Sequence, residues 1–300
     1  MASLEAIAER GTGTVREVAA AVGVSVVTAN NVVRDLEAAG AIDEIARRQG
    51  HRGPRARVFR VSPARTCFVA VRVDPGRMTA RCGDATGTGP AVTVAGTTPE
   101  TLADLVDRAA REQRRDAGQV RGVVAGVSPG FTEAMGARAA DLLGTPVRVH
   151  RGDHLAALAE AEVGAGRGAA VFLRVTGGPA PSTTLVLDGA PREGAHGAAG
   201  AMDRIPPQLT GTRAADGTEL TAYAVALACV IADPELVVLD QGVAEPELLP
   251  DRIRSVVKEL AGPEPEVVPS AVPGDPVLTG GRRLAWSGIL ADLARRAMAP

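Results

Sequence analysis

The order of strand and helix patterns after residue 66 limits the fold more than any other feature of this 300-residue sequence. Three short strand patterns, separated by turn residues such as Asp74-Pro75-Gly76, come before alternating helix and strand patterns. A similar order starts again near residue 170. This repetition predicts two similar α/β lobes with a cleft between them. The strand patterns lie at 67–73, 78–84, 91–95, 120–127, 146–149, 170–175, 183–187 and 236–239, and the helix patterns at 99–113, 133–143, 153–163, 220–232, 246–260 and 282–298.

The first 62 residues follow a different pattern, in which three short helices precede a two-stranded ribbon. Helix patterns occupy 2–10 and the segments that follow Thr14 and Ser25, two residues of a type that caps helix starts. The third helix has an apolar stripe formed by Ala29, Val32, Val33 and Leu36. Short strand patterns follow at 41–42 and 58–61. We therefore expect a winged helix-turn-helix domain at 1–62 and a second domain at 63–300, with lobes at about 63–165 and 166–300.

A second stripe on the third helix is displaced by about 200° from the apolar one and faces away from the core. It is formed by Val27, Asn30, Asn31 and Arg34. Asparagine can make paired hydrogen bonds to adenine in the major groove, valine can contact a thymine methyl group, and arginine can bind guanine or phosphate. Ser25 and Thr28 lie at the helix start, where phosphate contacts are expected. The alternative is an ordinary solvated face of a small helical bundle.

Basic side chains are concentrated in the ribbon, although the net charge of the whole chain is -2. Residues 1–62 contain nine arginines against seven acidic residues, and the stretch 47–60 contains no acidic residue. Its arginines are Arg47, Arg48, Arg52, Arg55, Arg57 and Arg60. Such a stretch attracts a phosphate backbone. Within it, Arg52-Gly53-Pro54-Arg55 fits either insertion of a guanidinium into a narrow minor groove or a plain turn with phosphate contacts.

Composition argues against several other classes of protein. Cys67, Cys82 and Cys229 are isolated in the sequence and odd in number, which argues against a disulfide framework and a cysteine zinc motif. No segment is long and apolar enough to span a bilayer, and the first residues lack a signal-peptide pattern. We therefore expect a cytoplasmic protein with no membrane contact, no metal and no cofactor.

Several short motifs come in a characteristic order along the chain. They are Asp84-Ala85-Thr86-Gly87, Gly126-Val127-Ser128-Pro129-Gly130, and the segments 155–160, 188–200 and 233–239. These motifs resemble those of the ROK family, named for repressors, open reading frames and kinases, and residues 15–42 resemble that family's DNA-binding segment. The resemblance implies an α/β fold class, with an N-terminal winged helix-turn-helix and a two-lobed actin-like or sugar-kinase-like domain of the ribonuclease H-like type.

The positions that carry phosphoryl transfer in ROK kinases differ in this chain. The resemblance aligns Asp74-Pro75-Gly76-Arg77 with an Asp-x-Gly-Gly-Thr phosphate loop, where proline removes a backbone donor. It aligns Arg151-Gly152-Asp153-His154 with Asn-Asp-x-Asn, so that Gly152 stands where the general base belongs. Residues 176–181 replace a Gly-Thr-Gly-Ile-Gly loop, and Asp240-Gln241-Gly242 replaces the Gly-Gly on the adenosine side. The resemblance therefore implies a kinase-like domain that is not an enzyme.

The sugar and zinc positions of the family are also replaced. Residues 201–204 read Ala-Met-Asp-Arg where the family has Glu-x-Gly-His, and the cysteine-rich zinc loop has no counterpart. A cleft between the lobes stays a candidate site for a ligand other than a hexose. Its side chains would be Arg151, Asp153, His154, His196, Asp203 and Arg204. The alternative is a domain that binds no ligand and only pairs two DNA-binding domains.

These observations predict a transcriptional regulator, by default a repressor, that binds a double-stranded DNA operator as a homodimer or homotetramer. An active sugar kinase and a protein-interaction scaffold are the alternatives. A hydrolase is disfavoured, because the Gly-x-Ser-x-Gly motif at 126–130 has Pro129 where an N–H is needed. Metal binding by His150 and His154 is disfavoured too, because His150 is expected at a strand end rather than on a helix.

Overall fold

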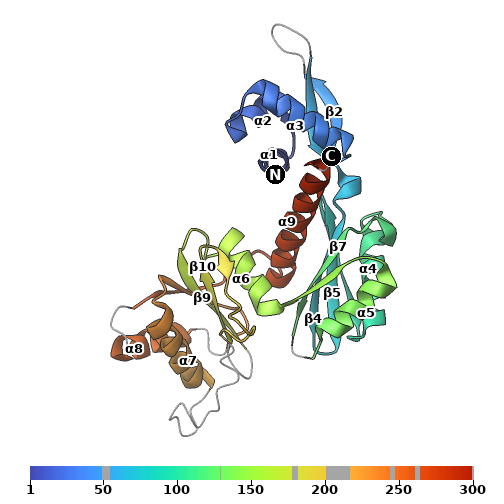
Figure 1. Ribbon diagram of the computed structural model, residues 1–300. Helices are drawn as coiled ribbons and strands as arrows, with labels where there is room; N and C mark the ends of the chain where they lie inside the picture. The colour runs from blue at the N-terminus through green and yellow to red at the C-terminus, as the bar shows by residue number, and fades with distance from the viewer. Residues whose placement is uncertain are drawn as a thin grey trace. The chain divides into compact units, whose positions relative to one another are not determined.

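The computed structural model describes residues 1–48, 55–128, 130–177, 182–200, 217–243, 247–260 and 264–298 (Figure 1). The chain forms two compact units. Unit 1 comprises Met1–Val149 and Gly281–Pro300, and unit 2 comprises His150–Gly280. The division at residue 62 and the lobe bounds at 165 and 166 stay predictions.

The N-terminal part of unit 1 has three helices and a small antiparallel sheet with the strand order β1-β3-β2. Its elements are α1 (Ala2–Arg10), β1 (Gly13–Thr14), α2 (Val15–Val22), α3 (Val26–Ala38), β2 (Ile42–Arg48) and β3 (Ala56–Val61). Thr14 and Glu17 form the expected capping box, since each side chain accepts a hydrogen bond from the other residue's backbone N–H. Ser25 caps α3 as expected.

The core under these helices comes from the apolar positions that the sequence pattern selects. Ile7 from α1, Val33 from α3 and Phe59 from β3 are fully or almost fully buried. Contacts of α1 with α2, α3 and β3 connect these elements. Because the apolar side of α3 faces this core, its other side is left for solvent.

The rest of unit 1 is built on a five-stranded sheet with the order β6-β5-β4-β7-β8. Its elements are η1 (Pro63–Arg65), β4 (Phe68–Asp74), β5 (Arg77–Asp84), β6 (Gly87–Ala95), α4 (Pro99–Glu112), η2 (Ala117–Gln119), β7 (Gly122–Val127), α5 (Glu133–Leu143) and β8 (Val147–Arg151). Strands β4 and β7 run parallel, as an α/β crossover through α4 requires. Helices α4 and α5 pack together beside the sheet (Figure 1), and the core between them is mainly Val, Leu and Ala.

Cys67 and Cys82 are neighbours in space although they are isolated in the sequence. Their sulfur atoms lie 3.5 Å apart, and both side chains are fully buried in the core of the sheet. The hydrogen bond between them lowers the pKa of Cys67 and raises that of Cys82. The two thiols are therefore a buried donor and acceptor pair.

Unit 2 has a second five-stranded sheet, with the order β11-β10-β9-β12-β13. Its elements are α6 (Gly152–Val163), β9 (Val171–Thr176), β10 (Ser182–Leu187), β11 (Ala190–Pro191), α7 (Gly217–Ala232), β12 (Leu236–Leu239), α8 (Leu249–Leu260) and β13 (Glu266–Pro269). Strand β12 runs parallel to both β9 and β13, whereas β10 is antiparallel to β9. Helices α7 and α8 pack against each other (Figure 1).

The last helix, α9 (Pro276–Met298), has residues in both units. Its start is capped by Asp275, whose side chain accepts hydrogen bonds from the backbone N–H groups of Val277 and Leu278. In unit 2, Gly280 lies so close to α6 that a Cβ atom there would be 1.8 Å from the carbonyl oxygen of Leu155. In unit 1, Trp286 contacts Phe68 edge to face.

Most element positions agree with the sequence patterns, and the differences have physical reasons. Helix α9 begins at Pro276 rather than residue 282, because Gly280 does not break the helix but lets its backbone approach α6. Strand β13 has no prediction; it is only four residues long and joins the sheet edge through parallel pairing with β12. None of the helices formed by described residues is both long and apolar enough to cross a membrane.

We expect Gly280→Ala to lower stability, although replacing a helix-interior glycine by alanine normally stabilises a helix by about 0.5–1 kcal/mol. The new methyl group would meet the backbone of Leu155, which cannot move as a side chain can. Overpacking of this kind costs about 1–3 kcal/mol. Gly118→Ala is the control, because a Cβ at Gly118 meets nothing within 4 Å. Thermal unfolding of the full chain measures both, and an unchanged or higher Tm for Gly280→Ala would contradict the close contact.

Candidate nucleic-acid interface

Helix α3 presents the predicted polar stripe to solvent. Asn30, Asn31 and Arg34 are exposed, and Val27 is 74% exposed. Ala29, Val33 and Leu36 on the opposite side are buried. A valine that is three-quarters exposed buries little apolar surface when the chain folds. Its side chain is therefore available for an apolar contact with a partner. The role of this stripe in reading DNA bases stays a prediction.

The start of α3 is formed by Ser25 and Thr28, which bond to each other. The Ser25 hydroxyl accepts a hydrogen bond from the Thr28 backbone N–H at 3.0 Å, and the two hydroxyl oxygens are 2.8 Å apart. Both residues are exposed. The positive end of the helix dipole is therefore open to solvent, which suits an approaching phosphate group.

Three arginines of the ribbon are bound by acidic residues, and for two of them an acid comes from a helix outside the ribbon. Arg47 bonds to Glu44 at 2.8 Å, and Arg48 bonds to Glu17 of α2 at 3.2 Å. Arg57 donates hydrogen bonds to both Glu37 of α3 and Glu44. Residues 47–60 contain no acidic residue in the sequence, but acidic side chains from other positions lie next to three of their arginines in the structure.

Arg57 holds the ribbon against α3. Its guanidinium lies 4.8 Å from the centre of the Phe59 ring, a cation–π arrangement, while Glu37 and Glu44 accept its hydrogen bonds. These hydrogen bonds raise the pKa of Arg57, and those from Arg47 and Arg57 lower the pKa of Glu44. Both sequence-predicted phosphate contacts near this cluster, Arg47 and Arg57, therefore have a second, structural role.

Two arginines of the predicted interface have weaker ion pairs or none among the described residues. Arg55 is exposed and forms no ion pair with any residue that the structure describes. Arg34 is exposed and lies 3.9 Å from Asp35, at the limit of an ion pair. Arg52 belongs to the segment 49–54, which lies outside the described residues.

The candidate ligand-binding residues of unit 2 come together at the start of α6. Arg151 bonds to both carboxylate oxygens of Asp153, and the Ser182 hydroxyl donates to Asp153 at 3.1 Å. Burial alone would raise the pKa of Asp153, but the hydrogen bond and charge of Arg151 outweigh it, so that the pKa lies below its ordinary value. Asp153 is a fully engaged anion, which makes it a poor general base.

The segment 193–200 covers this group. Arg151 donates to the carbonyl oxygen of Gly197 at 3.1 Å, and the His154 ring, only 4% exposed, lies 3.5 Å from the Glu193 carboxylate. His196, next to Gly197, is exposed. Asp203 and Arg204 lie outside the described residues, and the cleft itself stays a prediction.

The segment aligned with the first phosphate loop is a tight hairpin turn. Asp74 and Arg77 face each other across the β4–β5 ladder, so only Pro75 and Gly76 form the turn. Gly76 has a φ of 78°, a left-handed conformation that glycine adopts without strain. The Asp74 carboxylate is paired with Arg72 at 2.9 Å and with Arg77 at 3.3 Å. The turn thus presents an anion that its own arginines neutralise.

An ion pair between a buried arginine and a partly exposed aspartate occupies the ends of β9 and β12, next to the segments aligned with the other two nucleotide loops. Arg174 is 1% exposed, and it bonds to Asp240 at 3.0 Å and to the Thr176 hydroxyl at 2.9 Å. The segments after these strands touch, since a Cβ at Gly177 would lie 1.9 Å from the carbonyl oxygen of Gly242. Residues 178–181 lie outside the described part of the chain.

Neither a nucleophile elbow nor a metal centre is formed by the described residues. Ser128 follows β7, but α5 begins only at Glu133, and Pro129 lies outside the described residues. An elbow needs a helix directly after its serine. His150 lies in β8, as expected, and no group of three His, Cys, Asp or Glu among the described residues is arranged to hold a metal ion.

Comparisons with known proteins give matches among solved structures only; no protein-family model and no curated protein sequence matches the chain. The crystal structure of a ROK family transcriptional regulator, described as a homologue of the E. coli Mlc protein, covers 99% of this chain and 97% of its own, with a TM-score of 0.72 and 14% identity. The chain has the ROK fold. This confirms the predicted fold class.

Two ROK kinases share the fold over a smaller part of the chain. A ROK hexokinase from Thermus thermophilus has a TM-score of 0.61 at 17% identity and covers 75% of this chain and 99% of its own. A ROK family glucokinase from Streptomyces griseus, solved with glucose and AMPPNP, has a TM-score of 0.57 at 18% identity and covers 74% and 100%. At such identities the likeness is one of fold.

Sequence reasoning missed the acidic partners of the ribbon arginines and the buried Arg174. Glu17 lies 31 residues from Arg48, and Glu37 and Glu44 lie 20 and 13 residues from Arg57, so no local pattern marks these pairs. The Arg47–Glu44 pair, three residues apart, is the exception. Arg174 does carry a signal, because a lone arginine within the apolar strand Val171–Thr176 has no solvent-facing alternative once β9 is central in the sheet.

We expect Asp153→Asn to destabilise the protein at neutral pH by about 2 kcal/mol, the typical value of a hydrogen bond to a charged group. Because the folded pKa of Asp153 is lowered, its stabilising contribution exists above the unfolded pKa of about 3.9 and is lost as pH falls through the lower folded pKa. The difference between variant and wild type should therefore shrink below about pH 4. Urea unfolding between pH 7 and pH 3 measures it.

The control for this comparison is Asp141→Asn, which changes an exposed aspartate of α5 that forms no ion pair with the described residues. Its unfolding midpoint should match that of the wild type at every pH. A constant difference between Asp153→Asn and wild type over the whole pH range would mean that the charge of Asp153 contributes nothing.

Proposed function

We propose that this chain is a DNA-binding transcriptional regulator of the ROK family, by default a repressor. The support comes from the share of this chain, and of each similar solved structure, that the structural match covers. The kinases are matched over 99–100% of their own length yet cover about three quarters of this chain, so the remaining quarter has no counterpart in them. The regulator covers 99% of this chain. We assign the additional quarter to the three helices and ribbon before residue 63.

In this proposal α3 enters the major groove. Asn30 and Asn31 read adenines through paired hydrogen bonds, and Arg34 binds a guanine or a phosphate. Val27 contacts a thymine methyl group, while Ser25, Thr28 and the N-terminal end of α3 approach the backbone. The exposure of all these side chains supports the assignment.

The ribbon contributes phosphate contacts, led by Arg55, which has no competing acid among the described residues. Arg47 and Arg48 are exposed, and their ion pairs are of the surface type, worth about 0–1 kcal/mol, so a phosphate can displace the carboxylates. Arg57 mainly fixes the angle between ribbon and α3. Arg52 keeps its proposed role beside the minor groove or on a phosphate.

The ROK-fold domain, in this proposal, pairs two DNA-binding domains and does not transfer phosphate. Gly152 offers no side chain at the position of the general base, and the neighbouring Asp153 is committed to Arg151 and Ser182. At the nucleotide positions, Gly177 lies against the backbone of Gly242, and Asp240 is paired with Arg174, which does not favour a phosphate between them.

Pairing through this domain is supported by an exposed apolar face on α7. Leu227, Val230 and Ile231 are exposed, Ile231 by 86%, and their i, i+3, i+4 spacing puts them on one side of the helix. Exposed apolar residues that cluster in this way are typical of interaction surfaces. A homodimer, or a tetramer built from dimers, would match two operator half-sites.

Binding of the full chain to DNA that flanks its own gene tests the central proposal. Asn31→Ala should weaken binding to the preferred site by about 5- to 150-fold and barely change binding to unrelated DNA, since one paired base contact is worth about 1–3 kcal/mol. Arg55→Ala should weaken both to the same degree and lower the salt slope by about one. Fluorescence anisotropy across salt concentrations measures these effects.

Arg111→Ala is the matched control, because Arg111 is an exposed arginine of α4 that pairs with Asp107 outside the DNA-binding helices. Its affinity should equal that of the wild type. No binding by the wild type, or equal binding by the wild type and Asn31→Ala, would overturn the assignment of α3.

An ATP-turnover assay with a panel of hexoses separates the proposal from its main alternative, an active sugar kinase. We expect no hexose-dependent ATP consumption above background, because the base position is a glycine and Gly177 and Gly242, at the described ends of two nucleotide segments, lie against each other. Hexose-dependent turnover that follows the concentration of purified chain would overturn this part of the proposal and favour the kinase.

A further inference from the structure

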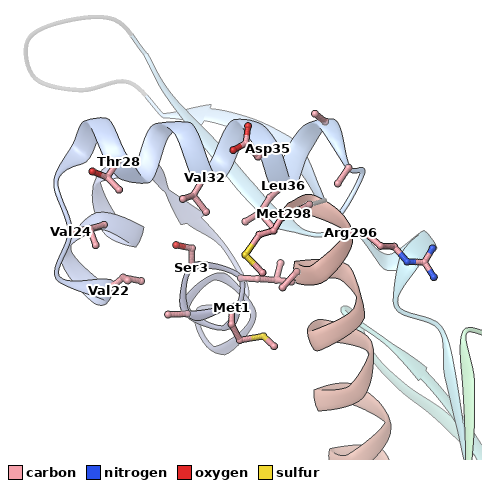
Figure 2. Close-up of a pocket in the computed structure, with 16 residues that line it drawn as sticks. Met1, Ser3, Val22, Val24, Thr28, Val32, Asp35, Leu36, Arg296 and Met298 are labelled. Atoms are coloured by element: carbon pink, nitrogen blue, oxygen red, sulfur yellow. The ribbon is translucent and has the colours of Figure 1, made fainter. Parts of the chain in front are cut away.

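A cavity of about 800 Å³ lies within unit 1, directly beneath α3. Figure 2 shows it between α3, the N-terminal half of α1 and the last turn of α9. The α2–α3 turn closes one end through Val22 and Val24. The cavity is separate from the exposed stripe of α3, because it meets the other side of that helix.

The walls of the cavity are mainly apolar. Val32 and Leu36 line it from α3, Leu4 from α1, and Ala297 and Met298 from α9. Figure 2 shows Met298 reaching toward Leu36. Cavities of about 300–1,000 Å³ with such walls and a few polar groups are typical small-molecule sites.

One buried polar group faces this apolar space. Ser3 is only 7% exposed, and its hydroxyl has no hydrogen-bond partner among the residues that the structure describes. In Figure 2 the hydroxyl oxygen points from α1 toward α3, on the side of Val32. The hydroxyl oxygen is not fully buried, so a molecule in the cavity can reach it, and a ligand that bonds to it gains the net value of one hydrogen bond, about 0.5–1.5 kcal/mol.

The charges around the cavity favour a neutral occupant. Arg296 is paired with Asp292 at 2.8 Å, and Figure 2 shows its guanidinium directed away from the cavity. Asp35 is half exposed at the rim and lies 3.9 Å from Arg34. An anionic ligand would therefore meet a carboxylate and no uncommitted side-chain cation among the described lining residues.

We propose that this cavity binds a neutral, largely apolar small molecule with one hydrogen-bonding group directed at Ser3. The inference deepens the proposed function, on which it rests, by naming an effector site within the DNA-binding part of the chain. Val32 and Leu36 move with Asn31 because all three belong to α3. A ligand that fits one position of α3 relative to α9 better than another changes DNA affinity by that difference.

The test uses N-phenyl-1-naphthylamine, a neutral aromatic probe with a single N–H group that fluoresces when it leaves water. Titration of the full chain without DNA should give saturable binding of one molecule per chain. Ala297→Trp and Val32→Trp fill the cavity from opposite walls and should each weaken binding more than 10-fold. Ser3→Ala should weaken it by about 2- to 10-fold, the value of one hydrogen bond.

Ala20→Trp is the control, because Ala20 is exposed on α2 and does not line the cavity. Its affinity for the probe should stay within twofold of the wild type. If a tryptophan variant fails to fold by circular dichroism, Ser3→Ala decides, since it removes one oxygen only. Binding that does not saturate, or that is equal in the wild type and in the folded cavity variants, would overturn the proposal.

A second measurement links the site to DNA. Saturating probe should change the affinity of the full chain for its preferred DNA at least fivefold, and Ala297→Trp should abolish this effect. Probe binding is measured without DNA, so failure to bind DNA leaves the cavity result intact and counts only against the proposed function. Saturable probe binding with unchanged DNA affinity would overturn the effector role.

Discussion

Helix α9 contributes residues to both compact units, and in unit 2 its close packing on α6 requires the missing side chain of Gly280. The backbone of α9 approaches the Leu155 carbonyl oxygen of α6 more closely than any side chain would permit. Further along the same helix, Gly288 leaves room for the guanidinium of Arg148, which would lie 2.4 Å from a Cβ at that position. Two glycines in one helix thus allow one close backbone contact and one close side-chain contact, at a cost of about 1 kcal/mol each in helix propensity. The end of α9 then lines the cavity under α3.

The distribution of charge shows how one arginine-rich stretch serves two purposes. Glu17, Glu37 and Glu44 hold Arg48, Arg57 and Arg47 at defined positions on the surface. These pairs are exposed, so each contributes little to stability, but together they limit the conformations of long side chains before any partner arrives. An interface that is ordered in advance loses less side-chain entropy on binding. Arg57 is the extreme case, with two carboxylates and an aromatic ring around it.

The parts of the fold that follow from local physics could be predicted from the sequence. The Thr14–Glu17 capping box, the Ser25 cap and the two faces of α3 depend on residues within one or two turns of each other. The start of α9 could not be predicted, because Gly280-Gly281 ends helices in most contexts and only the distant Leu155 explains it here. The same holds for the site. Exposure of Asn30 and Asn31 follows from helix periodicity, whereas the distant acids that bind Arg48 and Arg57 and the position of Ser3 at the cavity follow only from the three-dimensional fold.

The Arg174–Asp240 pair constrains which changes this chain can accumulate. Replacing Asp240 alone leaves a buried guanidinium without its counter-charge, and replacing Arg174 alone leaves a carboxylate beside an empty space in the sheet. Each single substitution therefore lowers stability, whereas replacing both residues together is tolerable. The effects of the two substitutions are thus strongly coupled. Gly177 adds a second constraint of the same kind, because a side chain at this position would clash with the backbone of Gly242. Substitutions at these positions are therefore accepted only together with compensating changes in their neighbours.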